Sequence, residues 1–112
     1  MSIWDAQSLQ NIIRSRGVIA QNRITELKQK IQENESYKEL YDEKLGEQFL
    51  LNCLEDSASL SSQKAFLQKL DEMKSSFRCP SQKFYEESKV KIGWLKAIES
   101  LEKSTTLSLN DT

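Results

Sequence analysis

Apolar residues recur every three or four positions through most of the chain, which is the spacing of one face of an α-helix. The segment from Ser2 to Ile31 shows this pattern throughout, and Asp5 or Ser2 is a suitable cap for its first turn. Its apolar positions are Ile12, Ile13, Ile19, Ala20, Ile24, Leu27 and Ile31. The pattern predicts a long amphipathic helix, and the last three residues also fit the heptad spacing of packed helix pairs.

The stretch from Tyr37 to Leu54 begins as a one-sided helix and ends apolar on nearly every side. Tyr37, Leu40, Tyr41 and Leu45 share one face, whereas Phe49, Leu50, Leu51, Cys53 and Leu54 leave little polar surface. Such a helix has to be covered from several directions, either by the rest of this chain or by another chain. We expect most of the core to collect here.

Residues Glu33 to Ser36 separate these two patterns. Ser36, followed three residues later by Glu39, has the form of a capping box and favours a new helix start. No glycine or proline enforces a break between Glu33 and Ser36. The first two helices are therefore either separated near these residues or joined into one long continuous helix.

A connector and a third helix follow. Residues 55–62 are mostly short hydroxyl and carboxylate side chains, which compete with a helix for backbone hydrogen bonds and favour turns. Residues 63–77 then carry a single apolar stripe with a polar reverse face. The stripe consists of Phe66, Leu67, Leu70, Met73 and Phe77. We expect one face of this helix to be buried and the other to be exposed to solvent.

Pro80 marks the approach to the last helix, because proline disfavours helical geometry in the preceding residue and suits a first helical turn. We expect this helix between Ser81 and Lys103. Its core candidates are Phe84, Tyr85, Ile92, Trp94, Leu95, Ile98 and Leu101. Residues 104–112 have too little apolar content to pack independently, so we expect a flexible tail there.

Together these elements predict an all-α fold, with residues 1–103 in a single helical domain. We expect an antiparallel bundle of three or four helices. The 112 residues include only three glycines and one proline, which suits long helices better than sheets with frequent turns. Gly17 indicates a kink or a close approach inside the first helix, and Gly93 indicates the close approach of a neighbouring helix.

Charge is distributed unevenly, although the net charge is only −1. Residues 1–32 carry five basic and two acidic side chains, residues 33–56 carry two basic and eight acidic ones, and residues 57–83 carry five basic and two acidic ones. This pattern suits an acidic helix held between basic neighbours by attraction within the chain.

The residue types limit the available chemistry. The chain has no histidine, which removes the commonest general base near neutral pH and the usual Ser-His and Cys-His pairs. Its two cysteines, Cys53 and Cys79, are too few for a four-ligand zinc site, and we interpret them as free thiols, buried or half-buried. A carboxylate-based enzyme is the least favoured class, because the acids between Glu33 and Glu43 have the pattern of a solvated helix face. We therefore expect no enzymatic activity, metal or cofactor.

The hydropathy of the chain argues against a membrane protein. No apolar run approaches the ~20 residues that a membrane span needs. The first ten residues lack the basic start and apolar block of a signal peptide. We therefore expect a cytoplasmic location without membrane contact.

Four residues are candidates for binding a protein partner. Trp4 lies near the start of the chain, and tryptophan is enriched among residues that dominate binding energy. The structural alternative is that Trp4 packs against the last helix. Phe49, Leu50 and Leu54 belong to the apolar segment, and any part of it that the bundle fails to cover would form an interface.

Arg14, Arg16 and Arg23 form an alternative site that could contact phosphates. Arg16 and Arg23 lie seven residues apart, two turns along one helical face. The slightly acidic overall balance is poor for a protein whose affinity would come mostly from phosphate neutralisation. We therefore expect no specific nucleic-acid binding.

The leading interpretation is a small non-enzymatic binding protein, an adaptor, chaperone or inhibitor that presents a helical surface to a protein partner or to a second copy of itself. An inhibitor encoded by a phage or mobile element also fits this size and this lack of reactive groups. Self-association is expected from the apolar segment 49–54 and from the heptad that ends at Ile31. A nucleic-acid-associated helical protein that uses the basic first helix is the alternative.

Overall fold

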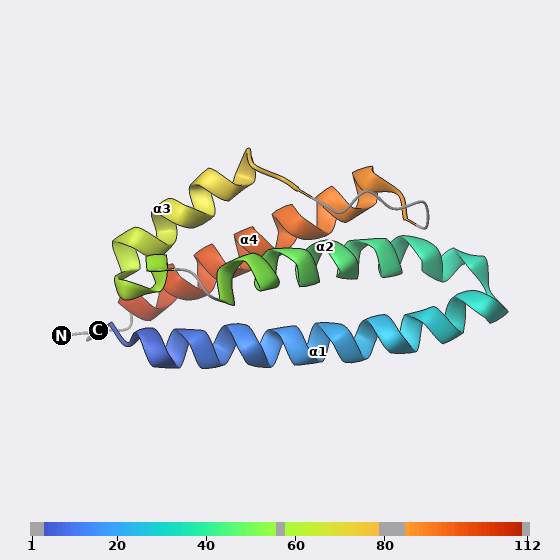
Figure 1. The fold of residues 1–112 in the computed structure, drawn as a ribbon, viewed down its shortest axis with the longest axis horizontal. Coiled ribbons are helices and arrows are strands. Elements are labelled where there is room, and N and C mark those ends of the chain that lie inside the picture. Colours follow the sequence, from blue (N-terminus) through green and yellow to red (C-terminus); the bar gives the residue numbers. More distant parts are fainter. Residues whose placement is uncertain (1–3, 56–57, 79–84, 111–112) are drawn as a thin grey trace.

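A computed structural model describes residues 4–55, 58–78 and 85–110. Within these residues the chain forms four α-helices, two short 3-10 helices and no strand, which confirms the all-α bundle. The α-helices are α1 (Ala6–Glu33), α2 (Lys38–Glu55), α3 (Gln63–Lys74) and α4 (Glu87–Asn110), and the 3-10 helices are η1 (Glu35–Tyr37) and η2 (Ala58–Ser61). The molecule is elongated, with extents of 51 × 24 × 22 Å (Figure 1).

The first helix begins at an expected cap and ends within residues 33–36, where a break was one of the two alternatives. The Asp5 side chain accepts the Gln7 N–H at 3.1 Å and caps α1, as predicted. Asn34 ends α1 with an extended backbone, and its side-chain oxygen accepts the Ser36 N–H at 3.0 Å. The first two helices are therefore separate. The cap at the break is Asn34 rather than Ser36, because the Asn34 amide oxygen already satisfies the N–H that opens the next turn.

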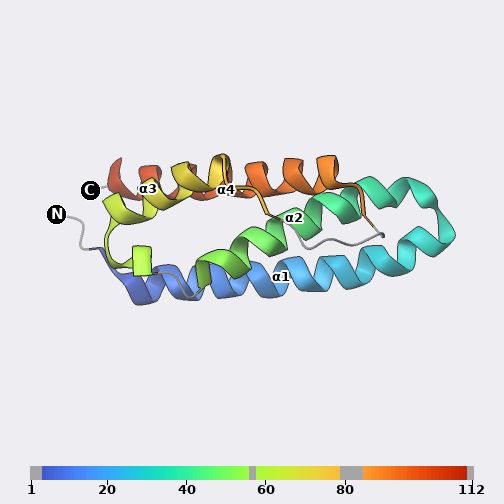
Figure 2. The same cartoon turned by 45° about the horizontal axis from the view of Figure 1, so that its top comes forward.

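The helices differ in direction along the bundle. α1 folds back antiparallel to α2, whereas α2 and α4 are parallel (Figures 1 and 2). The polar contacts agree, since Glu39 meets Lys89 and Glu43 meets Lys96 further along both helices. The predicted antiparallel order therefore holds for α1 with α2 but not for α2 with α4. A parallel pair needs a long connection, and the segment that includes η2 and α3 returns the chain to the start of α4.

The main core lies towards the end of the bundle where α3 packs on α4. Its buried members are Leu9, Ile13, Ala20, Leu50, Leu51, Leu54, Leu60, Phe66, Leu70, Met73, Trp94, Ala97, Ile98 and Leu101. Trp94 is the largest of them, and its Nε1–H donates to the Met73 carbonyl at 2.9 Å. Its ring also meets the Phe77 ring edge-on, with 5.4 Å between the centroids. These contacts hold α3 and the segment after it onto α4.

The backbones of α2 and α4 touch at two glycines. A Cβ added to Gly46 would lie 1.9 Å from the Val90 carbonyl oxygen, and one added to Gly93 would lie 1.8 Å from the Glu43 carbonyl oxygen. Any side chain at either position would push the helices apart. The close approach expected at Gly93 is therefore confirmed, and Gly46 provides the matching bare surface on α2.

α4 ends later than expected. It continues to Asn110, past the end that we placed at Lys103. Thr105 accounts for part of the difference, because it is buried and its hydroxyl donates to the Leu101 carbonyl at 2.7 Å. The Gln63 side chain also donates to the Thr105 carbonyl at 3.2 Å and ties this part of α4 to the first turn of α3. The flexibility of residues 104–112 stays a prediction.

Some expectations for the later part of the chain fall on residues that the structure does not describe. The predicted helix start at Ser81 and the core candidate Phe84 are among them, as is Cys79. Tyr85, the next described residue, is half-buried and precedes α4. The helix boundary expected between Glu55 and Ser62 is confirmed, since α2 ends at Glu55 and Ser62 caps α3 by accepting the Ala65 N–H at 3.0 Å.

Replacing Gly46 or Gly93 with alanine should lower the free energy of unfolding by about 2–3 kcal/mol, because the new methyl group would meet backbone atoms rather than a movable side chain. The gain in helix propensity, about 1 kcal/mol, offsets only part of the clash. Urea unfolding followed by circular dichroism measures the change.

Gly17→Ala is the matched control for these two variants. The nearest atom to a Cβ at Gly17 is Nε2 of Gln48 at 3.9 Å, an ordinary van der Waals contact. This substitution should raise the free energy of unfolding by about 0.5–1 kcal/mol, because alanine is the better helix former. Equal effects at all three positions would contradict the close crossing.

Candidate partner-binding groove

Two of the predicted partner-binding residues are core residues. Leu50 and Leu54 are fully buried within the single chain, so neither can reach a partner of the folded protein. Phe49 is half-buried, and its ring lies edge-on to the Tyr85 ring with 6.1 Å between the centroids. The chain therefore covers most of its own apolar segment. This removes the main reason for expecting self-association.

Trp4 packs onto its own molecule as well. Its Nε1–H donates to the Leu60 carbonyl at 2.6 Å, and its ring centroid lies 6.2 Å from that of Phe66. It is half-buried, and these contacts are with η2 and α3 rather than with the last helix. The indole thus holds the start of the described chain in place. Its role as a partner anchor stays a prediction.

Cys53 differs from the expectation of a buried or half-buried thiol. It is exposed and free. Neighbouring residues on a helix point about 100° apart, so Cys53 falls outside the face that buries Leu50 and Leu54. A serine at this position should therefore have little effect on stability.

The three arginines of α1 do not form one surface. Arg14 pairs with Glu55 of α2 at 3.3 Å and lines a depression on one flank of α1. Arg16 and Arg23 line depressions between α1 and α4. Arg16 donates to two serine hydroxyls of α4 at 3.2 Å each, and Arg23 pairs with Glu26 at 2.9 Å. This division between two flanks weakens the case for a phosphate-binding face.

Glu26 is the counter-ion of two cations on α1. Hydrogen bonds from Lys30 and then from Arg23 hold the pKa of the Glu26 carboxyl below its usual value. A lowered carboxyl pKa means that the charged form is favoured, so the pairing persists at neutral pH and is lost as pH falls through that pKa. Arg23 is therefore neutralised locally, whereas Arg16 has no such neighbour.

The most exposed isoleucines lie on α1. Ile12 and Ile19 are 48% and 66% exposed. They alternate with Arg16 and Arg23 at steps of four, three and four residues, which places all four side chains in one row along the helix. We call Ile12, Arg16, Ile19 and Arg23 the α1 row. The sequence places both isoleucines in the apolar pattern of the first helix. The structure shows that they lie beside its buried stripe, in line with the two arginines.

A groove lies between the α1 row and α4. Both helices pack on α2, which lies between them in Figure 2, yet no described Cα atom of α1 is within 8 Å of one in α4. The groove contains two depressions of about 240 and 300 Å³. The residues that line the first depression include Arg16, Leu51 and Ser100. Those that line the second include Arg23, Leu40 and Gly93. Glu47 and Lys96 line both depressions. Leu40 is 47% exposed and provides apolar surface in the groove.

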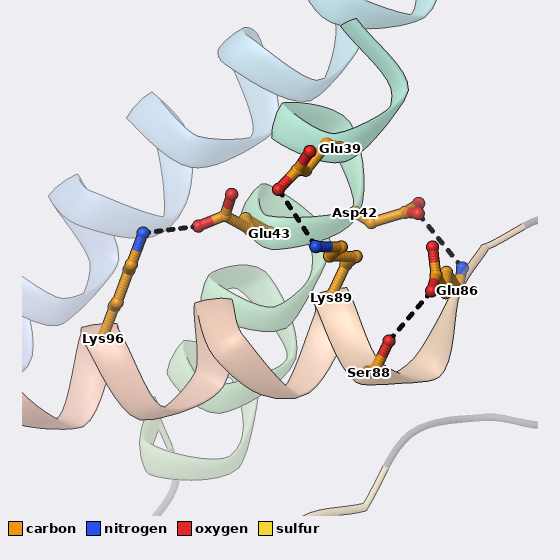
Figure 3. Close-up of polar contacts among 7 residues, drawn as sticks. All are labelled: Glu39, Asp42, Glu43, Glu86, Ser88, Lys89 and Lys96. Carbon is orange, nitrogen blue, oxygen red and sulfur yellow. Dashed lines mark hydrogen bonds and ion pairs between the residues drawn. The ribbon is translucent and has the colours of Figure 1, made fainter. Parts of the chain in front are cut away.

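Ion pairs join α2 to α4 beside the close crossing (Figure 3). Glu43 pairs with Lys96 at 2.7 Å, and Glu39 pairs with Lys89 at 3.1 Å. The hydrogen bond from Lys89 to Glu39 raises the pKa of that lysine. The acidic α2 is thus held between basic neighbours, as its charge indicated. The second neighbour is α4, however, and not the basic segment 57–83.

A buried carboxylate positions the start of α4. Asp42 of α2 is 1% exposed, and its Oδ2 accepts the Glu86 N–H at 3.1 Å (Figure 3). Its Oδ1 accepts from the Lys38 ammonium at 2.6 Å. Glu86 immediately precedes α4 and its carbonyl accepts the first helical N–H groups, so Asp42 lies at the positive end of the α4 dipole. This arrangement is structural, because the carboxylate is fully occupied by its own chain.

The described residues contain no metal-binding constellation. No three His, Cys, Asp or Glu side chains among them gather where they could hold a metal ion. In the same part of the chain no helix has the length and apolar character needed to cross a membrane. Comparison with protein-family models, curated proteins and solved structures finds no match for the chain. The groove and the α1 row are therefore the basis for a functional proposal.

Asp42→Ala should lower the free energy of unfolding by about 2–3 kcal/mol, because it leaves the Glu86 N–H without its buried acceptor and removes the negative charge beside Lys38. Asp42→Asn should cost less, since its amide oxygen can still accept the Glu86 N–H. Thermal unfolding at fixed pH compares the two variants. The control is Glu39→Ala, which removes an exposed ion pair and should change stability little. An Asp42→Ala effect no larger than that of Glu39→Ala would show that Asp42 does not position α4.

Proposed function

We propose that the chain is a small non-enzymatic binding protein that takes an amphipathic α-helix of a protein partner along the α1 row and the adjoining groove. The observation that carries this proposal is the α1 row itself. Ile12 and Ile19 are exposed two turns apart, which is the spacing at which a docked helix presents its own apolar anchors. Covering two isoleucines removes substantial apolar area from water and favours association.

The groove is suited to an elongated occupant. α1 and α4 form its walls, α2 forms its floor, and the half-exposed Leu40 contributes apolar surface to it. The two depressions are open to solvent and shared between three helices, so a small molecule would remain partly solvated there. A helix laid along the groove would contact both depressions and the α1 row together.

Charge indicates what kind of helix fits. Arg16 of the α1 row has no carboxylate within 4.0 Å among the described residues, whereas Arg23 and Lys96 are paired with Glu26 and Glu43. A partner helix with a carboxylate beside its apolar residues would complement the Arg16 charge. A second copy that docked through the same row would instead bring two such arginines together without an acid from either row. The charge pattern therefore favours a different, acidic partner over self-association.

The same surface serves an adaptor, a chaperone or an inhibitor, because these roles differ in the partner rather than in the chemistry of the groove.

The nucleic-acid alternative is less favoured. Arg14 lies on the other flank of α1, and both Arg14 and Arg23 are already paired with carboxylates of the same chain.

A photoreactive amino acid at position 19 should form a discrete adduct with one partner protein in the native cells of this chain. Position 18 is the matched control, because Val18 is 61% exposed but points to a different side of α1 from Ile19. Mass spectrometry should place the crosslink in a helical segment with apolar residues at three- and four-residue spacing and nearby acids. Equal adducts from both positions would contradict a partner that docks on the α1 row.

Leu40→Glu supplies a second control in the same experiment. This substitution puts a carboxylate into the groove without touching the core, because Leu40 is half exposed. It should reduce the position-19 adduct about tenfold, the effect of losing one buried apolar side chain. An unchanged yield in a folded Leu40→Glu variant would place the partner outside the groove.

The purified chain should sediment as a monomer at micromolar concentration. Its most apolar segment is covered by its own core, and the arginines of the α1 row oppose pairing of two copies through that row. Sedimentation velocity over a hundredfold concentration range measures the mass. A concentration-dependent dimer that Ile12→Glu and Ile19→Glu abolish would show that the α1 row binds a second copy instead.

A further inference from the structure

Arg16 joins the two walls of the groove through hydroxyl groups. Its Nη1 donates to Ser100 Oγ and its Nη2 donates to Ser104 Oγ, each at 3.2 Å. Ser100 and Ser104 lie one turn apart on the same face of α4. A single guanidinium from α1 therefore holds two hydroxyl groups of α4, although no described Cα atom of α1 lies within 8 Å of one in α4.

The Arg16 guanidinium lacks a counter-ion within the described chain. It is half-buried, and no described carboxylate lies within 4.0 Å of it. Two neutral hydroxyls orient the charge but do not neutralise it. A partly desolvated cation without a carboxylate is a favourable place for an external anion.

Hydrogen-bond donors remain available around Arg16. The guanidinium has five N–H groups, of which the two serines occupy two. Each serine accepts from Arg16, and neither hydroxyl donates to another group of the described chain. The O–H groups of Ser100 and Ser104 are therefore free to donate to the same ligand as the remaining guanidinium N–H groups.

The surroundings add further cations and are not purely basic. Lys96 lines the same depression as Arg16 and Ser100 but is paired with Glu43 at 2.7 Å, and Lys103 lines a further depression together with Ser104. Glu47 also lines the first depression, and it is paired with Lys44 at 2.8 Å. Glu99 lines the further depression. The site thus combines a guanidinium and two hydroxyls with the Lys103 ammonium nearby, and the carboxylate that lines the first depression is already paired.

We propose that Arg16, Ser100 and Ser104 form a binding site for a tetrahedral oxyanion of the phosphate class. The donors come from two helices and are more numerous than the two that a planar carboxylate usually takes from arginine. A tetrahedral oxyanion can accept from the guanidinium and from both hydroxyls at once. Its binding would link α1 to α4 across the groove. The site depends on these three residues and not on a protein partner.

Nuclear magnetic resonance titration with inorganic phosphate tests the site in the intact chain. The Arg16 Nε–Hε resonance and the backbone amides of Ser100 and Ser104 should shift in a saturable manner, with half-saturation at about 1 mM, as expected of a few charge-assisted hydrogen bonds at a partly exposed site. Sulfate should act like phosphate. Equal shifts with acetate or chloride at the same ionic strength would overturn the assignment of a tetrahedral oxyanion.

Two variants separate these residues from general charge effects. Arg16→Gln and the double substitution Ser100→Ala with Ser104→Ala should each weaken phosphate binding about tenfold or more, since each removes donors to a charged ligand. Both introduce good helix formers, and unchanged resonances in α3 would confirm the fold. Arg14→Gln is the matched control, because Arg14 lies on the other flank, and it should leave phosphate binding unchanged.

The wild-type titration keeps the proposal falsifiable even if a variant fails to fold. Shifts that appear at Arg14 or Arg23 with the same midpoint as at Arg16 would overturn it. Leu40→Glu distinguishes this site from the partner-binding proposal, because it should weaken helix docking about tenfold while phosphate still binds at Arg16 with an unchanged midpoint.

Discussion

The contact between Gly46 and Gly93 is the constraint on which the rest of the structure depends. With no side chain at either position, the α2 and α4 backbones approach until each glycine faces a carbonyl oxygen of the other helix. Glu43 and Lys96 can then pair beside the crossing, and Asp42 can reach the start of α4. Because α4 lies so close to α2, α1 packs on another side of α2 and does not reach the α4 backbone. The groove is thus a consequence of the crossing.

Hydrophobic spacing predicts the helices well, because apolar residues recur on the side that each helix buries. It found α1, α3 and the connector before α3, and the position of Gly93 beside Trp94 indicated the close approach. It could not predict that α2 and α4 are parallel, because an apolar stripe shows which side is buried and not in which direction the neighbour points. The same limit applies to Leu50 and Leu54, because the sequence shows that their segment is apolar but not that the chain itself buries both side chains.

The site was less predictable than the fold. α1 carries a buried stripe and the exposed isoleucines of the α1 row side by side, and only the arrangement of α2 and α4 decides which of them meets water. Arg16 could be read as basic and helical from the sequence, but its hydroxyl neighbours lie 84 and 88 residues away. Hydrogen bonds between residues so far apart leave no pattern in the local sequence. Gly46 likewise stands among polar residues, where nothing in the sequence marks it as a point of backbone contact.

The parallel pairing of α2 with α4 has a consequence for synthesis. Ribosomes make α4 after the other three described α-helices, so α2 leaves the exit tunnel well before the helix that touches its backbone. Until then α1 can pack on α2, but the faces of α2 and α3 that contact α4 in the folded chain stay uncovered. A nascent chain that ends before α4 would expose apolar surface and invite aggregation or chaperone binding. Completion of α4 is therefore the step that covers this apolar surface and completes the core.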